Sequence, residues 1–421
     1  MRILYINHYA GSFDYGMEFR PLYLSREWVR LGHEVLIVAA SESHVRSKQP
    51  NMDGNRELEE TIDGVRFLWL KTPRYDGNGI GRIWNIFCFL LGVWRKSGVL
   101  AEQFRPDVVI ASSTYPMDIV PAERVAKKAG AKMVFEVHDL WPLSPIELGG
   151  MSPRHPFIRL VQWAEDRAYR LSDIVISMLP KAKEYMCSRG MAPEKFFYVP
   201  NGIDLQAWDQ DQMPVPGTME NEIFRLKNAG KFLVGYLGAH GLANGLDVFL
   251  ESADLLQRRD RAKRFQLVLV GSGPEKKRLQ NRAREMGLEN LTFFDSVSKR
   301  TVPSAIRMMD AVYIGLQKKS LFRYGISPNK LIDYMAAGVP VLNAVEAGNN
   351  PVEDARCGLS IPAQNPIALA DAIEKISSFS RDEIAQMSAR ARRYVETNHD
   401  YRILAKAFLE RISENPISGK G

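Results

Sequence analysis

Short apolar runs rich in valine and isoleucine alternate with longer amphipathic segments along most of the chain. Each run ends in turn residues, a pattern typical of strands buried on both faces of a parallel sheet. Such strands are predicted at 2–9, 34–40, 107–112, 131–138 and 173–178, and then at 232–238, 265–271, 291–297, 311–316 and 339–344. Helical periodicity fills the segments between them and continues from about 366 to 413.

A turn-rich break at 199–217 separates two stretches of alternating strands and helices. The pattern predicts an α/β fold with two tandem, doubly wound, Rossmann-like domains. We expect an N-terminal domain at 1–205 and a C-terminal domain at 206–398, with a helix at about 399–421 packing back on the first. Ligands of such folds bind beyond the carboxyl ends of the strands, so the expected site is a cleft that both domains face.

Turns with glycine or histidine follow several predicted strands. Glycine frees backbone amides at a helix N-terminus, where the helix dipole favours phosphate. One such turn taken alone is equally well explained as an ordinary strand-to-helix connection, and a strand-end histidine as a structural residue. Several turns at one edge favour a ligand site, whose candidates are Gly11, Ser12, His138, Gly238, His240, Gly241, Asn244, Gly271 and Gly273.

The stretch "SPNKLIDYMAAGVPVL" (327–342) predicts a helix that carries further candidates. Ser327 is the expected N-cap, followed by proline at the first helical position and then Asn329. Lys330, together with Arg323 in the preceding loop, could face a bound diphosphate, although a solvated lysine is the alternative. The Asp333 carboxylate could accept two hydrogen bonds from the vicinal diol of a ribose.

Composition narrows the class of protein. The 421 residues are 45% hydrophobic and 25% charged, as in ordinary soluble proteins, and three scattered cysteines lack metal spacing. A start without the long apolar core of a signal peptide favours a cytoplasmic protein. The formal net charge of +7 is spread out rather than clustered, which argues against nucleic acid and allows a weak attraction to an anionic surface.

The segment "IWNIFCFLLGVW" (83–94) is almost wholly apolar and is flanked by Arg74, Arg82, Arg95 and Lys96. Twelve residues are too few to span a bilayer. Two interpretations remain open. The segment is either a buried core helix or a helix that places aromatic residues in a membrane interface, with its basic flanks on lipid head groups.

Taken together, the motifs resemble glycosyltransferase family 4, whose members are retaining enzymes with the GT-B fold. The resemblance covers nearly the whole chain. It is carried by "VPNGID" (199–204), "GYLGAHGLANGLDVFLES" (235–252), "LVGSGPEKKRL" (269–279) and "SPNKLIDYMAAGVPVL". The phrase "FEVHDLWPLSPIELG" (135–149) is similar to a bacterial subgroup that builds O-antigen and capsule repeat units.

The resemblance implies a donor, an acceptor and a reaction. The C-terminal domain would bind a nucleotide diphosphate sugar, expected to be UDP-linked and of the N-acetylated hexosamine type. The N-terminal domain would bind a polyprenyl-diphosphate-linked sugar or a glycan. Carried over by position, His138 is the catalytic histidine near the anomeric carbon, and Asp333 holds the ribose. Gly238 and Gly241 would line the diphosphate, and neither a cofactor nor a metal is expected.

The chain departs from the family pattern in three places. The usual acid-x7-acid motif needs a glutamate eight residues before its second acid, where this chain has Gly325. The common arginine and lysine after the first strand of the C-terminal domain are Ala239 and Asn244 here. Lys330 and Arg323 are expected to supply the missing charge.

Two alternatives to sugar transfer remain. An epimerase of UDP-sugars uses the same fold, but it needs acids or bases around the sugar ring, where the motifs offer only His138 and Asp139. A non-catalytic sugar-nucleotide-binding protein is the other alternative, favoured slightly by the departures from the family pattern.

Overall fold

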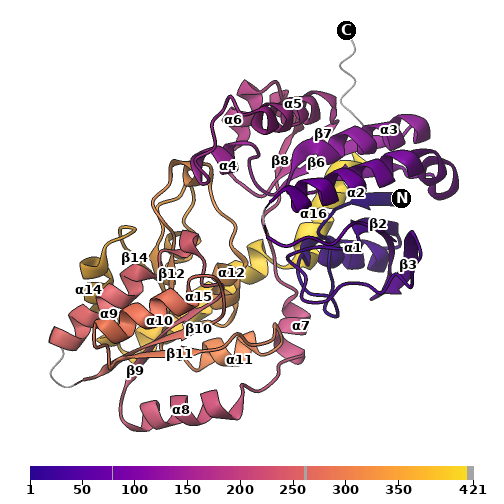
Figure 1. Ribbon diagram of the computed structural model, residues 1–421. Helices are drawn as coiled ribbons and strands as arrows, with labels where there is room; N and C mark the ends of the chain where they lie inside the picture. Colours follow the sequence, from indigo (N-terminus) through magenta and orange to yellow (C-terminus); the bar gives the residue numbers. More distant parts are fainter. Residues whose placement is uncertain (78, 260–262, 415–421) are drawn as a thin grey trace. The chain divides into compact units, whose positions relative to one another are not determined.

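The computed structural model describes residues 1–77, 79–259 and 263–414 (Figure 1). It divides the chain into two compact units. The first comprises Met1–Asn201, Tyr324–Ile326 and the segment from Tyr401 onward, and the second comprises Gly202–Arg323 and Ser327–Asp400. Part of the helix predicted at about 399–421 lies outside the described residues.

The first unit is built on an eight-stranded sheet in the order β3-β4-β2-β1-β5-β6-β7-β8. Every neighbouring pair is parallel except β3 and β4. The strands are β1 (Arg2–Ile6), β2 (Glu34–Ala40), β3 (Glu57–Ile62), β4 (Val65–Leu70), β5 (Val108–Ala111), β6 (Lys132–Val137), β7 (Ile174–Ser177) and β8 (Phe196–Tyr198). The predicted parallel α/β fold is confirmed for this unit.

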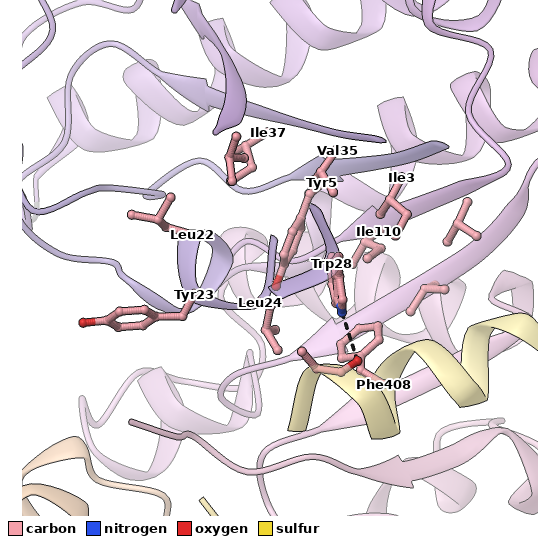
Figure 2. Packing of buried hydrophobic residues seen from close by; sticks show 14 of the residues in the cluster. Ile3, Tyr5, Leu22, Tyr23, Leu24, Trp28, Val35, Ile37, Ile110 and Phe408 are labelled. Atoms are coloured by element: carbon pink, nitrogen blue, oxygen red, sulfur yellow. Dashed lines mark hydrogen bonds between the residues drawn. The ribbon is translucent and has the colours of Figure 1, made fainter. Parts of the chain in front are cut away.

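Helices cover both faces of this sheet. They are α1 (Arg20–Arg30), α2 (Ile80–Val99), η1 (Leu100–Phe104), η2 (Pro116–Asp118), α3 (Ile119–Ala129), α4 (Leu143–Glu147), α5 (Pro156–Leu171), α6 (Lys183–Ser188), η3 (Pro193–Lys195) and α16 (Tyr401–Ser413). Figure 2 shows the packing on one face, where Trp28 of α1 lies between Tyr5 of β1 and Phe408 of α16. The Trp28 indole donates a hydrogen bond to the Ala405 carbonyl at 3.0 Å. The last described helix is therefore part of the first core.

The hairpin of β3 and β4 was absent from the sequence prediction. Its two-residue turn is Asp63-Gly64, with φ of 49° and 80°. Aspartate followed by glycine is the preferred pair for such turns, because both positions need positive φ. The signal was present at 57–70, but alternating residues on an exposed edge strand are less conspicuous than an apolar run.

The helix around the apolar segment is longer than its twelve-residue centre. With η1 it covers Ile80–Phe104, 25 residues that contain an 18-residue window with a mean hydropathy of 1.2, which by length and composition alone is enough to cross a membrane. The twelve apolar residues are therefore only the centre of a longer helix. Phe89 and Val93 are fully buried, however, and α2 packs along α3. One side of α2 thus belongs to the core of the first unit.

The second unit has a six-stranded, wholly parallel sheet in the order β11-β10-β9-β12-β13-β14. The strands are β9 (Phe232–Leu237), β10 (Phe265–Val270), β11 (Leu291–Phe294), β12 (Ala311–Gly315), β13 (Val341–Ala344) and β14 (Gly358–Ser360). The helices are α7 (Leu205–Gln210), α8 (Gly217–Asn228), η4 (Leu242–Asn244), α9 (Asp247–Arg259), α10 (Lys276–Glu285), α11 (Val302–Arg307), η5 (Ser320–Tyr324), α12 (Asn329–Ala336), α13 (Pro351–Ala355), α14 (Pro366–Ser377) and α15 (Arg381–Asn398). The predicted second α/β domain is confirmed.

Candidate functional site

Lys330 of α12 lies beside the loop that follows β9. Its ammonium group donates to the Tyr236 hydroxyl at 2.9 Å and to the Asn244 side-chain oxygen. A Cβ added at Gly238 would lie 3.6 Å from Cε of Lys330, so the loop passes close to the lysine side chain. Burial lowers the pKa of Lys330 to about 8. The structure therefore brings together three of the predicted site residues, Gly238, Asn244 and Lys330.

Several donors of this loop are still available. Within the described part of the chain, the backbone amides of Ala239 and Gly241 have no acceptor. Two of the three ammonium hydrogens of Lys330 are donated to Tyr236 and Asn244. The Tyr236 hydroxyl donates its own hydrogen to the Ala239 carbonyl at 2.8 Å. Backbone amides beside a cation form a cradle suited to an anion such as a diphosphate.

Gly271 and Gly273 allow two strand-end loops to pack on each other. A Cβ at Gly271 would lie 2.0 Å from the Gly238 carbonyl oxygen, and one at Gly273 would lie 2.5 Å from that of His240. Both glycines have strongly positive φ, 153° and 152°. The His240 amide also donates to the Ser272 carbonyl at 2.8 Å. These two predicted site residues thus have a packing role that holds the loop after β9 in place.

The imidazole of His240 faces the interior. The side chain is fully buried, and neither ring nitrogen has a hydrogen-bond partner among the described residues. Burial, and then the charges of Lys276 and Lys330, lower the pKa of His240 to about 4, so the ring is neutral. In this conformation the ring supports the loop, and a ligand would meet the backbone of His240 first.

The start of α12 differs from the prediction by one residue. The helix begins at Asn329 with Pro328 at the N-cap position, and no side chain caps it. Ser327 as N-cap is therefore wrong, because Pro328 has an extended rather than helical backbone. Gly325 is buried with φ of 107°, a conformation that L side chains rarely adopt. The glycine that replaces the family glutamate is thus required by the loop. Arg323 lies exposed in η5.

Asp333 is buried in the second turn of α12 and already has a cationic partner. Both carboxylate oxygens accept hydrogen bonds from the Lys299 ammonium, at 2.8 and 2.6 Å. Lys299 also lies 5.6 Å from the centroid of the Trp208 ring. A ribose diol at Asp333 would have to share the carboxylate with this lysine. Neither Lys299 nor Trp208 was selected from the sequence, because the loop after β11 has no glycine or histidine turn and Trp208 lies within α7.

The sequence also has an acid-x-acid triplet, Asp209 to Asp211, whose first carboxylate forms a surface ion pair. Asp209 lies 2.6 Å from Arg392 of α15. Within residues 1–77, 79–259 and 263–414, no group of three or more histidine, cysteine or acidic side chains could hold a metal ion.

In the first unit, the loop that follows β1 closes on itself. A Cβ at Gly11 would lie 2.0 Å from the Gly16 carbonyl oxygen, so only glycine fits. Ser12 is fully buried, and its hydroxyl has no partner among the described residues. The Arg46 guanidinium holds the loop by donating to the Ala10 carbonyl at 2.7 Å. Gly11 and Ser12 are therefore buried within the folded loop and contribute to its conformation.

His138 follows β6 and caps a buried network of charged and polar groups. Its Nε2 lies 2.8 Å from the Ser112 hydroxyl and 3.4 Å from the Glu136 carboxylate. Glu136 forms a fully buried ion pair with Arg20 at 2.9 Å and accepts hydrogen bonds from Tyr5 and Ser112. Burial alone would raise the pKa of Glu136, but Arg20, His138 and Ser112 hold it well below the usual range. Glu136 is therefore ionised.

The directions of the hydrogen bonds in this network determine which ring nitrogen of His138 carries the hydrogen. Ser112 has one hydroxyl hydrogen and donates it to Glu136 at 2.6 Å. The Ser112 oxygen must then accept from Nε2 of His138, so that nitrogen carries a hydrogen. In the neutral ring, Nδ1 is left as an acceptor for a substrate hydroxyl. Sequence spacing could not reveal this arrangement, because Arg20 and Glu136 are 116 residues apart.

Comparisons with known proteins identify a separate domain family for each unit. Residues 15–202 match the model of the glycosyl transferase 4-like domain, and residues 231–378 match that of glycosyl transferases group 1. Two Escherichia coli K12 proteins, both named colanic acid biosynthesis glycosyltransferases, are similar along the chain. WcaI is 25% identical over 332 residues, 76% of this chain and 78% of WcaI. WcaL is 28% identical over 410 residues, 94% of this chain and 92% of WcaL.

A solved structure, Anabaena Alr3699/HepE in complex with UDP and glucose, has the same fold. The TM-score is 0.67 at 14% identity, over 99% of this chain and 100% of that chain. With one matching domain model on each parallel-sheet unit, the chain belongs to the glycosyltransferases of the GT-B fold, with a glycosyl transferase 4-like domain followed by a group 1 domain.

Proposed function

We propose that this glycosyltransferase moves a sugar, an N-acetylated hexosamine, from a UDP-linked donor to a lipid-linked acceptor in the synthesis of a bacterial surface polysaccharide. The pathway is supported by WcaI and WcaL, both named for colanic acid biosynthesis. The donor class is supported by the complex of HepE with UDP and glucose. The observation that carries the proposal is the cradle of Lys330 and the free amides of Ala239 and Gly241.

The proposed reaction proceeds with retention at the anomeric carbon. The bond from that carbon to the β-phosphate oxygen breaks while the bond to the acceptor oxygen forms on the same face. The acceptor hydroxyl proton passes to the departing diphosphate. Lys330 and the loop amides stabilise the negative charge that develops on that diphosphate, which is the main catalytic task. Nδ1 of His138 orients a sugar hydroxyl, and no metal enters the scheme.

The test combines donor and acceptor in one incubation. UDP-N-acetylhexosamine is mixed with the protein and a polyprenyl-diphosphate-linked sugar, and lipid and nucleotide products are separated. A glycolipid product together with UDP supports transfer. A changed free UDP-sugar would mean epimerisation, and binding without turnover would mean a sugar-nucleotide-binding protein. Either of these two results would overturn the proposal.

A role for Asp333 in ribose binding can be separated from its ion pair with Lys299. Asp333→Ala should weaken the affinity for UDP by about tenfold or more, but should hardly affect 2′,3′-dideoxy-UDP, which lacks the diol. Lys299→Met is the matched control, since it breaks the ion pair and leaves the carboxylate. Equal losses for both nucleotides would show that Asp333 only stabilises the unit.

The membrane contact of the proposal rests on the outer side of α2. Ile83, Trp84 and Phe87 are 48%, 55% and 50% exposed, and the rings of Trp84 and Phe87 stack with centroids 5.4 Å apart. Exposed aromatic residues beside basic ones suit a bilayer interface. Replacing Trp84 and Phe87 by serine should abolish co-sedimentation with liposomes. Phe224→Ser, at a 66% exposed position in the second unit, is the matched control and should not change it.

A further inference from the structure

A cluster of hydrogen-bond donors lies where β1 ends and α2 begins. Arg82, in the first turn of α2, donates to the Tyr9 hydroxyl through two nitrogens, at 3.2 and 3.0 Å. The Tyr9 ring stacks on His8 at 4.4 Å and meets the edge of His44 at 5.5 Å. Tyr9 is 4% exposed, so its ring is firmly held. The side chain of Arg82 is half-buried, and that of His44 reaches the surface.

Hydrogen bonds within the cluster limit where its hydrogens lie. Arg82 occupies both lone pairs of the Tyr9 oxygen, so the Tyr9 hydroxyl is left as a donor. The Tyr75 oxygen accepts from the His44 backbone amide at 3.1 Å and lies 2.7 Å from Nδ1 of His44. When Tyr75 is the donor in the second bond, Nε2 of His44 carries the ring hydrogen. Burial, and then the charge of Arg82, lower the pKa of His44 to about 4, so the ring is neutral at pH 7.

The cluster thus presents donors to its surroundings. Neither the Tyr9 hydroxyl nor Nε2 of His44 has an acceptor within the described part of the chain. Arg82 adds a positive charge and can only donate. An arrangement of a guanidinium, a phenol and an imidazole N–H matches the several acceptor oxygens of a phosphate group.

The same helical turn adds an apolar surface. Ile83 and Trp84 follow Arg82 directly, and Phe87 lies one turn further along the exposed side of α2. Arg82 lies seven residues before Phe89, on the buried side of α2, and its side chain is partly exposed at the start of the helix. A ligand that fits both features has an anionic head and a hydrocarbon tail.

We propose that Arg82, Tyr9 and His44 bind the diphosphate of a polyprenyl-diphosphate acceptor while Ile83, Trp84 and Phe87 contact its hydrocarbon chain. The inference rests on the proposed function, because it names the residues that hold the acceptor of that reaction. The acceptor lipid is chosen over ordinary anionic phospholipid because the donors are fixed around one phenol, whereas general attraction to a bilayer needs only loosely placed positive charge.

The test measures binding to phosphatidylcholine vesicles that contain undecaprenyl diphosphate. Arg82→Met should weaken binding by about 10- to 100-fold through the loss of a charged hydrogen bond, and Tyr9→Phe by about 2- to 10-fold through the loss of one hydroxyl. Lys48→Met, which removes an exposed cation elsewhere in the unit, is the matched control and should not change binding. Tyr9→Phe keeps the buried ring, so it remains informative if Arg82→Met unfolds.

A second set of vesicles separates the two sources of phosphate. With phosphatidylglycerol in place of the diphosphate lipid at equal charge, Arg82→Met and Tyr9→Phe should behave like the unmodified protein. Equal losses on both vesicle types would overturn the inference and leave sugar transfer intact. Binding of UDP by both variants should be unchanged. If the unmodified protein binds the diphosphate lipid at this cluster but transfers no sugar, the proposed function fails and the binding site stands.

Discussion

Removing the Arg20 side chain should destabilise the first unit strongly. Arg20 is fully buried, pairs with the buried Glu136, and also donates to the carbonyls of Val199 and Pro200. Breaking a buried ion pair from one side costs about 3–5 kcal/mol. Each carbonyl left without a donor adds up to about 1–3 kcal/mol where water cannot reach it. We therefore expect Arg20→Met to lower the free energy of unfolding by about 5 kcal/mol, a large part of a domain's total stability.

The assay is urea unfolding followed by tryptophan fluorescence. Six of the seven tryptophans lie in the first unit, so the signal reports mainly on it. Arg30→Met is the matched control, because Arg30 lies on the same helix but its side chain is 49% exposed where it pairs with the largely buried Glu27. That pair should contribute no more than about 1 kcal/mol. If Arg20→Met costs no more than Arg30→Met, the reasoning is refuted.

A double variant and a pH series test whether the unpaired charge of Glu136 causes the loss of stability in Arg20→Met. In Arg20→Met/Glu136→Gln both members of the buried pair are neutral, and the amide oxygen of the glutamine can still accept from Tyr5 and Ser112. The double variant should therefore be more stable than Arg20→Met alone. In the unmodified protein the lowered pKa of Glu136 adds stability above about pH 4.3, and this is lost as the pH falls. Without Arg20, burial raises the pKa of Glu136 instead, so the cost of Arg20→Met should shrink as the pH falls from neutral.

Three further predictions concern single groups. Gly271→Ala should destabilise the second unit by more than about 2 kcal/mol in thermal unfolding. The new Cβ would lie 2.0 Å from the Gly238 carbonyl oxygen, and Gly271 has a positive φ that alanine rarely adopts. Gly217→Ala is the control and should be nearly neutral, because a Cβ there meets no other atom. The affinity for UDP should fall as the pH rises through the Lys330 pKa of about 8. Lys330→Met should remove this pH dependence, whereas Lys277→Met, at an exposed position, should keep it. A flat pH profile in the unmodified protein would contradict the role of Lys330 in binding the diphosphate. Long-range ¹H–¹⁵N spectra of His138 should show the hydrogen on Nε2, and a spectrum with Nδ1 protonated would contradict the inferred hydrogen-bond order.

Much of the fold followed from the sequence because both sheets are mainly parallel and buried, so most of their strands appear as apolar runs. The strands at 2–9 and 291–297 were predicted too long, since β1 ends at Ile6 and β11 at Phe294. The hairpin of β3 and β4 was missed because it lies at an edge, where residues 57–62 alternate between exposed and half-buried.

The candidate site was predictable only in part. Gly238 and Lys330 could be placed near each other because strand-end loops and helix starts meet at one edge of a parallel sheet. The partners of Asp333 and His138 could not. Lys299 is 34 residues from Asp333, and its approach depends on how α11 and α12 pack. A sequence pattern shows which residues are polar, whereas their hydrogen-bond partners depend on tertiary packing.

The position of α16 has a consequence for how the chain folds during synthesis. Trp28 and the rest of the first core need α16, yet residues 202–400 of the second unit are translated in between. At about 5–20 residues per second, the ribosome needs about 10–40 s for that stretch. Through this interval the nascent first unit has its sheet but lacks one covering helix, and the apolar patch around Trp28 and Tyr5 is open to chaperones. The unit that starts first is therefore the one completed last.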